Sequence, residues 1–169
     1  MTNASGTYLS EQSEGESPRL RDEPRTAPAL PVKSLEAEVV VQVPFYDLDP
    51  MGIVWHGNYP RYFEVARCAL LEKLDYSYPQ MEKSGYSWPV IDLHVRYIKP
   101  LRFDQRVKVK ATIVEWEYRL KMRYLISDAA SGERLTKGDS VQVAVDQKTG
   151  EMCLMSPPVL FERLGLPRP

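Results

Sequence analysis

The sequence predicts an α+β domain in which an antiparallel sheet packs around one long helix. Residues 59–74 carry apolar side chains at helical spacing, and a stretch with two-residue alternation precedes them. Four further alternating stretches follow, joined mainly by hairpin-length turns, which favours antiparallel pairing. A single sheet with a single helix on one face is an α+β arrangement.

The composition is typical of a soluble globular protein. The 169 residues are enough for one domain with a real core, and 43% of them are hydrophobic and 27% charged. The net charge of -1 disfavours a nucleic-acid partner, and no run approaches the roughly 18 apolar residues of a membrane span. Because the N-terminus lacks the apolar core of a secretory signal, we expect a cytoplasmic protein whose Cys68 and Cys153 are free thiols.

Residues 1–35 are predicted to form a disordered tail. They are rich in Ser, Glu, Arg and Pro and cannot bury enough apolar surface to offset their chain entropy. The folded domain is expected over residues 36–165. The domain is expected to begin with a strand in which every second residue lies on the buried face. These residues are Val39, Val41, Val43 and Phe45.

The rest of the domain is predicted to contain the long helix and the other strands. The helix spans about four to five turns at 3.6 residues per turn, and Pro79 either ends it or separates it from a short second helix that runs up to Gly85. The outer sheet face mixes charges with apolar residues, which is consistent with partial burial in an oligomer. The later expected elements are strands at 91–97, 107–113, 120–126 and 135–145, a short apolar run at 152–155 and a helical turn at 157–164.

Residues 47–59 form a turn-rich loop between the first strand and the helix. The loop also contains the apolar residues 53–55, which indicate that it packs against a scaffold. Asn58 can cap the following helix. The unpaired N–H groups at the start of that helix would then point toward Asp49 and His56.

This loop and the segment after it resemble a known family. The run DLDPMGIVWHGNY (47–59), followed by RYFEVAR (61–67), is similar to the hotdog-fold acyl-CoA thioesterases of the 4-hydroxybenzoyl-CoA thioesterase type. The thioesterases associated with the Tol-Pal system look closest. The run RYIKPLRFD (96–104) resembles the family's strand–turn–strand segment, so the resemblance covers about residues 36–165.

The resemblance implies a hotdog fold, with one long helix wrapped by a five-stranded antiparallel sheet. It also implies a homodimer or homotetramer with active sites at the subunit interface. The expected reaction is hydrolysis of acyl-CoA or acyl-carrier-protein thioesters, without a cofactor. Asp49 occupies the position of the family's catalytic carboxylate, which acts as nucleophile or general base. His56 occupies the position whose backbone N–H is implied to polarise the thioester carbonyl. Some relatives carry a tyrosine where this chain has Phe45.

Further residues are candidates for substrate binding or have more ordinary interpretations. Glu64 is a candidate because related enzymes place a carboxylate on the helix, but an i,i+3 ion pair with Arg67 is the stronger interpretation. Asp47 is expected to be a turn residue, and neither histidine has the nearby Cys or His ligands of a metal site. The remaining candidates are Trp55, Gly57, Asn58 and Tyr59 around the loop, and Lys99 and Arg102 for the phosphates of coenzyme A.

Two other functions remain open from the sequence. A hotdog dehydratase of 3-hydroxyacyl thioesters pairs a histidine with a helix carboxylate, as His56 and Glu64 could. A non-catalytic acyl-thioester binding protein is the other alternative, and intact Asp49 and His56 speak against it. A serine hydrolase is disfavoured because the chain has no Gly-x-Ser-x-Gly motif. The sequence leaves open the acyl group and its carrier, coenzyme A or protein.

Overall fold

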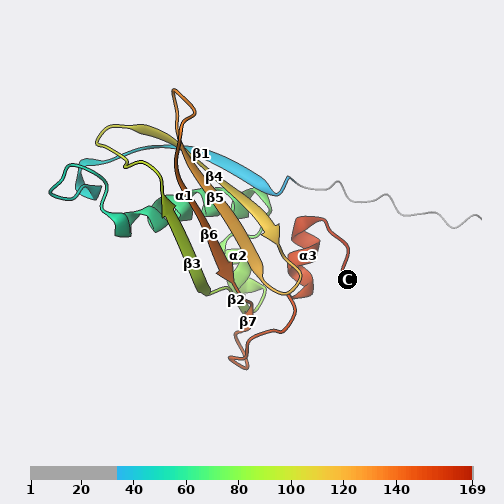
Figure 1. Ribbon diagram of the computed structural model, residues 1–169. Coiled ribbons are helices and arrows are strands. Elements are labelled where there is room, and N and C mark those ends of the chain that lie inside the picture. Colours follow the sequence, from blue (N-terminus) through green and yellow to red (C-terminus); the bar gives the residue numbers. More distant parts are fainter. Residues whose placement is uncertain (1–33, 169) are drawn as a thin grey trace, which may run out of the picture.

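The computed structural model describes residues 34–168, and its main feature is a five-stranded antiparallel sheet (Figure 1). The spatial order of the strands is β1-β4-β5-β6-β3. This sheet and its single long helix confirm the predicted α+β class. The predicted tail falls almost entirely outside the described residues. The strands are β1 (Glu36–Gln42), β3 (Val90–Tyr97), β4 (Arg106–Glu115), β5 (Leu120–Asp128) and β6 (Arg134–Gln142).

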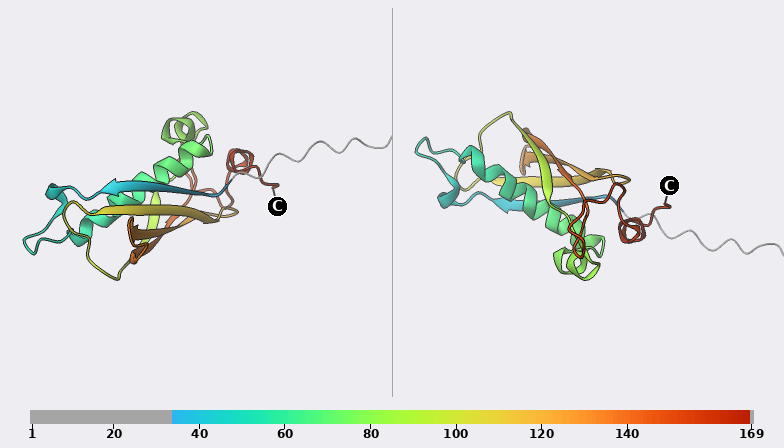
Figure 2. Two further views of the ribbon diagram at one scale, coloured as in Figure 1. Left: turned by 90° about the horizontal axis from the view of Figure 1, so that it is seen from above. Right: turned by 90° about the horizontal axis from the view of Figure 1, so that it is seen from below.

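The long helix α1 (Tyr59–Lys73) lies along one face of the sheet, as Figure 2 shows from two sides. Its apolar face packs against the sheet side chains that point toward it, such as every second side chain of β4, and both sets of side chains are therefore buried. The helix ends where Asp75 adopts a left-handed conformation, with φ of 59°. Its buried residues are Tyr59, Tyr62, Phe63, Ala66, Leu70 and Leu71.

A glycine in β6 sets how closely α1 approaches the sheet. A Cβ atom built at Gly138 would lie 2.4 Å from the Phe63 ring, closer than packed atoms can come. The missing side chain lets Phe63 stack on the ring of Tyr124 in β5, with centroids 4.6 Å apart and planes within 10° of parallel. The first turns of α1 are therefore fixed against the middle of the sheet.

The smaller elements agree with the sequence in part. Helix α2 (Tyr78–Lys83) begins with Pro79 in its first turn, and α3 (Pro158–Leu164) is the expected terminal helix. The last predicted strand is split, because β6 ends at Gln142 and β7 (Val145–Asp146) pairs with β2 (Tyr86–Ser87) in a separate two-stranded sheet. Alternation along one segment could not reveal this, since the pairing partner lies about 60 residues away.

One local expectation was wrong. The first strand ends at Gln42 instead of reaching Phe45, because the chain turns at Pro44 into a short 3-10 helix, η1 (Phe45–Asp47). The Phe45 side chain is consequently exposed, and it contacts Phe103 edge-on. The apolar run at 152–155 forms no strand, only an isolated bridge between Met152 and Val145.

Strand β3 is an edge strand with an unusually exposed set of apolar side chains. It pairs with β6 on one side, and the sheet order leaves its other side unpaired within the described residues. Large apolar side chains are exposed on it and just after it: Val90, Ile91, Leu93, Tyr97 and Ile98. The opposite edge, β1, has alternating half-buried side chains and packs beside α1. Among residues 34–168, none of the helices is long and apolar enough to span a membrane.

Candidate active site

The loop between β1 and α1 projects from one end of the molecule and is held by a buried carboxylate (Figure 1). Asp47 is only 4% exposed. Its carboxylate accepts hydrogen bonds from the Arg61 guanidinium at 2.8 Å and the Tyr62 hydroxyl at 2.7 Å. Its carbonyl oxygen accepts from the Trp55 N–H at 2.9 Å and the Asn58 side-chain amide at 3.0 Å. Asp47 therefore ties the two ends of the loop to the first turn of α1.

The middle of the loop packs on the segment before β4. Val54 is buried, and its N–H donates to the Leu101 carbonyl at 2.9 Å. Ile53 forms an isolated bridge with Arg102. These contacts confirm the packing role of Ile53 and Val54, whereas Trp55 stays half-exposed.

Asp49 has a different environment from Asp47. One oxygen of its carboxylate accepts from the Met51 N–H at 2.8 Å, which closes a tight turn, and lies 3.5 Å from the Ile53 N–H. The backbone N–H of Asp49 donates to the Ile53 carbonyl at 2.8 Å. The second carboxylate oxygen has no hydrogen-bond partner among the described residues. Asp49 is half-buried, so this oxygen remains available to a substrate.

The chain then enters α1 through a short 3-10 helix, η2 (His56–Asn58). The first N–H groups of such a segment lack acceptors inside it, so those of His56 and Gly57 can serve as donors to a ligand. The Tyr97 hydroxyl of β3 donates to the His56 carbonyl at 2.8 Å and holds this turn against the sheet. The expected cap was wrong: the Asn58 side chain bonds the Asp47 carbonyl and makes no cap on α1.

A cavity of about 300 Å³ lies beside Asp49. Its walls come from the loop, the start of α1 and the end of β3. A separate hollow of about 400 Å³ lies between β1, η1 and α1, and it does not include Asp49. The residues around the smaller cavity are Asp49, Met51, Ile53, Val54, His56, Tyr59, Tyr97, Ile98, Lys99 and Pro100.

The structure brings four of the predicted site residues together in this cavity: Asp49, His56, Tyr59 and Lys99. Tyr59 is buried, and burial raises the pKa of its hydroxyl, so this hydroxyl stays protonated at neutral pH. The Tyr59 oxygen accepts a hydrogen bond from the Leu101 N–H at 3.2 Å. Lys99 reaches the rim and forms an exposed ion pair with Glu133.

The other predicted residues lie outside this cavity. Trp55 is half-exposed, and its ring lies 5.0 Å from that of His56. Gly57 has a packing role, because an added Cβ would lie 2.3 Å from the Trp55 ring. The Asn58 side chain helps to hold the loop through its hydrogen bond to the Asp47 carbonyl. Arg102 is exposed in the turn before β4.

Glu64 belongs to another group of side chains. It forms the expected i,i+3 ion pair with Arg67 and accepts a hydrogen bond from the Tyr78 hydroxyl. It does not line the cavity that contains His56. The His56–Glu64 pair that a dehydratase would need is therefore not assembled within the described protomer.

Sequence reasoning missed two contributors to the site. Asp47 was expected to be an ordinary turn residue, whereas it is the buried anchor of the loop. Tyr97 was recognised only as a strand residue, although it supports the His56 turn. The signal for Asp47 was the pair Arg61 and Tyr62 in the first turn of α1, which can be recognised only once this helix is placed against the loop.

Comparison with known proteins gives the family. The sequence model of the Thioesterase-like superfamily matches residues 43–163. The chain is 34% identical over 110 residues to "Putative acyl-CoA thioesterase YneP" of Bacillus subtilis, which covers 64% of this chain and 79% of that protein. It is 31% identical over 128 residues to "Putative esterase sll0410" of Synechocystis, covering 75% of this chain and 77% of the relative.

A solved structure supports the same assignment. The DHNA-CoA thioesterase from Staphylococcus aureus superposes with a TM-score of 0.65 and 32% identity, over 70% of this chain and 80% of that chain. The chain therefore belongs to the Thioesterase-like superfamily, and the predicted hotdog thioesterase fold is confirmed. The more specific relation to Tol-Pal-associated enzymes stays a prediction.

Proposed function

We propose that this protein hydrolyses acyl-CoA thioesters in the cavity beside Asp49. The observation that carries the proposal is the half-buried Asp49 carboxylate next to the N-terminal turns of η2 and α1. One of its oxygens has no partner within residues 34–168. A carboxylate there can reach a thioester carbon whose oxygen is bound by helix N–H groups. The thioesterase names of the relatives support this assignment.

Two routes of hydrolysis are compatible with this geometry. In the first, an Asp49 oxygen bonds to the acyl carbon, the C–S bond breaks with its electron pair leaving on sulfur, and water then hydrolyses the mixed anhydride. In the second, Asp49 takes a proton from a water molecule as that water attacks the same carbon. The C–S bond then breaks with its electron pair leaving on sulfur, and the proton passes from Asp49 to the thiolate. Both routes give a free acid and a thiol, and both place negative charge on the carbonyl oxygen next to the backbone N–H of His56.

The rim of the cavity is suited to the carrier end of the substrate. Lys99 lines it and Arg102 lies at the following turn, so both can meet phosphates of coenzyme A. Lys99 would have to exchange its exposed ion pair with Glu133, which costs little because exposed pairs contribute only about 0–1 kcal/mol.

The active assembly is proposed to be a homodimer or homotetramer in which β3 is covered by a second copy. The edge of β3 that no described strand pairs with, together with its exposed apolar side chains, supports this arrangement, since such an edge otherwise invites aggregation. The Asp49 cavity borders Tyr97 and Ile98 at the end of β3, so a partner there would also close the cavity. Light scattering should give a molar mass of at least a dimer. A fully active monomer would contradict the proposal that a second subunit completes the active site.

The function is tested by offering the full chain a panel of acyl groups on coenzyme A and on an acyl carrier protein. Release of free thiol from any of them supports hydrolysis, and the carrier with the higher kcat/KM identifies the substrate form. Hydration of an enoyl-CoA without thiol release would instead identify a dehydratase. Binding without either reaction would identify an acyl-thioester binding protein.

A further inference from the structure

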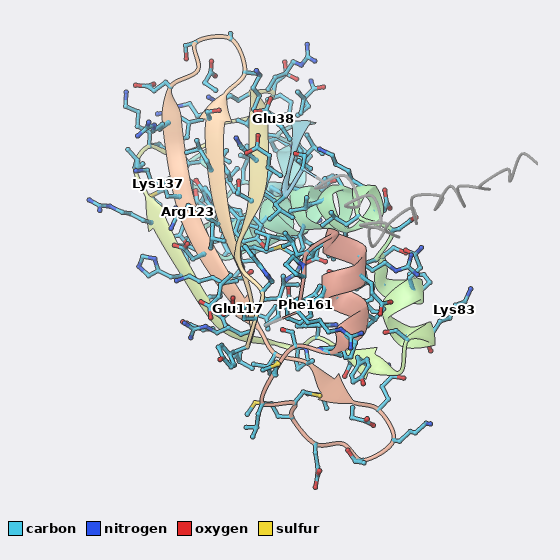
Figure 3. The ribbon with its side chains drawn as sticks, turned by 90° about the vertical axis from the view of Figure 1, so that its right-hand side faces the viewer. Glu38, Lys83, Glu117, Arg123, Lys137 and Phe161 are labelled. Atoms are coloured by element: carbon cyan, nitrogen blue, oxygen red, sulfur yellow. The ribbon has the colours of Figure 1, made fainter. Side chains whose placement is uncertain are left out.

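Strand β3 carries three polar side chains on the sheet face turned away from α1, namely Asp92, His94 and Arg96. Arg96 lies opposite Lys137 of β6, and Figure 3 shows the Lys137 side chain on this outer face. All three polar side chains of β3 are exposed. Within residues 34–168, neither Asp92 nor Arg96 takes part in a salt bridge. A cation and an anion on one edge strand are therefore free to pair with another chain.

The ladder between β3 and β6 determines which backbone groups of β3 face the free edge. The Ile98 N–H donates to the Leu135 carbonyl at 2.9 Å, in the same register as the rest of the β3–β6 pair. Hydrogen-bonded pairs alternate with unbonded ones in an antiparallel ladder, so the even-numbered residues in 92–96 turn their N–H and C=O groups toward β6. The odd-numbered residues in 93–97 turn theirs toward the free edge, where a second strand can bind them.

A second copy of β3 can bind this edge in only a few alignments. Two identical strands related by a two-fold axis pair antiparallel. Because the odd-numbered residues of one copy must meet those of the other, the axis has to pass beside a single residue. A bulge between Val90 and Asp92 and the end of β3 at Tyr97 limit the regular segment to 92–97. The axis therefore lies near the middle of this segment.

The alignment centred on His94 matches both faces of the strand. On the outer face it places Asp92 opposite Arg96 of the partner subunit, and the two-fold symmetry repeats this pair on the other side of the axis. On the inner face it places Leu93 opposite the partner's Val95. Opposite charges directly across an antiparallel pair stabilise it, as do apolar pairs.

The neighbouring alignments lose this complementarity. Moving the axis one residue earlier places Arg96 opposite the partner's Val90, so the guanidinium gains no carboxylate. Moving it one residue later places Asp92 opposite the partner's Ile98 and Arg96 opposite the partner's His94. Neither of these alignments pairs Asp92 with Arg96, so charge favours the axis at His94.

We propose that Asp92 and Arg96 determine how β3 recognises a second copy of this chain, through two symmetric ion pairs that flank His94 at the two-fold axis. The proposal rests on the assembly proposed above, which leaves the alignment of the two strands open. Asp92 and Arg96 act here as recognition residues, and the bond-breaking step does not involve them.

This alignment also assigns a residue of the second copy to the active site. Beyond the ion pair, the next residue along the second strand is Ile91 of the partner subunit, which then lies beside Tyr97. Tyr97 lines the Asp49 cavity and holds the His56 turn. Ile91 is exposed and lies outside the Asp49 cavity of its own protomer. The partner's Ile91 would therefore supply an apolar wall that the single protomer lacks.

The first test reverses one charge at a time in the full chain and measures the molar mass by light scattering over a dilution series. Arg96→Asp places two carboxylates in each pair, and Asp92→Arg places two guanidinium groups there. Each variant alone should dissociate at a concentration about tenfold or more above that of the wild type, because like charges directly opposite are destabilising. An equimolar mixture of the two variants should regain the wild-type mass, because every pair in the mixed dimer again joins opposite charges.

Arg106→Asp is the matched control for these reversals. Arg106 is exposed at the start of β4, on the same outer face and three strands away from the β3 edge. Its reversal should leave the dissociation unchanged. Wild-type mass in both single reversals, or a mixture that stays dissociated, would overturn the ion pairs. A wild-type protein that is monomeric throughout would overturn the assembly as well.

A cysteine at the axis tests the alignment independently. His94→Cys should form a disulfide-linked dimer at pH 8 under mild oxidation, because unbonded antiparallel pairs have Cα atoms about 4.5 Å apart, within disulfide range. Lys137→Cys, one strand further from the axis, should give no more linked dimer than the wild type, whose Cys68 and Cys153 set the background. A linked dimer from Val95→Cys and none from His94→Cys would overturn the alignment.

The contribution of Ile91 is tested on the substrate of the thioester panel that is hydrolysed fastest. Ile91→Ala should keep the wild-type mass and lower kcat/KM by about fivefold or more, because part of an apolar wall is lost. Val40→Ala is the control, since Val40 is half-exposed on the opposite edge strand, and its kcat/KM should not change. An unchanged kcat/KM in Ile91→Ala would remove this residue from the site.

The outcomes separate this proposal from the function on which it rests. Absence of thiol release from every substrate would overturn the hydrolase function, and the masses and cross-links would still decide the alignment. Hydrolysis together with failed cross-linking at position 94 would overturn only the alignment. If a charge-reversed variant does not fold, the cross-linking of His94→Cys decides in its place.

Discussion

Asp47 and Asp49 stand two residues apart in one loop, and the structure gives them opposite environments. Asp47 is buried, and its two carboxylate oxygens accept from Arg61 and Tyr62. Asp49 is half-buried, uses one oxygen to close a turn and leaves the other toward a cavity. A carboxylate with both oxygens bound to side chains of α1 is suited to holding the loop, whereas one with an unpartnered oxygen in a cavity is suited to chemistry.

The proposed catalytic group, Asp49, is positioned by a neighbouring carboxylate with a structural role. Asp47 connects the β1 end of the loop to Trp55 and Asn58 at its other end. Asp49 lies between these two ends of the loop, so the hydrogen bonds of Asp47 help to set the distance between Asp49 and the start of α1. Such supporting contacts are what keep a catalytic group in a productive geometry.

The largest effect on activity is expected from Asp49→Asn. The asparagine oxygen can accept the same hydrogen bond from the Met51 N–H, so the turn and the melting temperature should be retained. The loss of a nucleophile or base should lower kcat by a factor of about 10² or more, with little change in substrate affinity. Steady-state thiol release and melting curves measure both. A variant that keeps more than about a tenth of wild-type kcat would show that the catalytic carboxylate is misassigned.

Asp47→Asn should show the reverse pattern, a loss of stability. An ordinary turn aspartate would tolerate this change, but the structure shows that an amide would remove the charged acceptor of Arg61 and would leave only one oxygen to accept from the Arg61 and Tyr62 donors. The free energy of unfolding should fall by about 1–2 kcal/mol, measured by urea denaturation. Asp75→Asn is the control, because Asp75 is exposed and asparagine tolerates its left-handed backbone. Equal midpoints for the two variants would contradict the anchoring role.

His56→Ala is expected to have a smaller effect on kcat than Asp49→Asn. If the backbone N–H at this position binds the carbonyl oxygen, removing the imidazole leaves that donor in place. Its carbonyl still accepts from Tyr97, so the turn should be preserved. A loss of kcat within about tenfold is expected from removing an auxiliary proton donor. A loss as large as that of Asp49→Asn would assign the chemistry to the imidazole.

The smallest effect is expected far from the loop, at the β5–β6 turn. The Ser131 N–H, together with Gln105, lowers the pKa of Asp128 to about 2. Because the folded state has the lower pKa, the ionised carboxylate stabilises the fold above the ordinary pKa of 3.8, and this contribution is lost as pH falls toward 2. Asp128→Asn should therefore be slightly less stable than wild type at pH 6, with the two denaturation midpoints converging near pH 2. A constant difference across this range would contradict the assignment.

The local periodicity of the sequence predicted the strands that alternate regularly and the helix that follows the first of them. Strands β4 and β5 bury one side chain in two, so their pattern is complete within a few residues. Helix α1 has its buried residues at the expected spacing. The position of Asp49 in a loop before this helix also followed from the sequence, because turn formers and a helix start are local signals.

The tertiary structure decided the features that depend on residues distant in the chain. The pairing of β2 with β7, the close approach of Phe63 over Gly138 and the binding of Asp47 by Arg61 and Tyr62 each require the elements to be packed first. The same holds for the cavity beside Asp49, whose walls come from the loop, the start of α1 and the end of β3. Periodicity reports which face of a segment is buried, whereas the partner of that face depends on the topology of the whole sheet. This is why the different environments of the two aspartates became visible only in three dimensions.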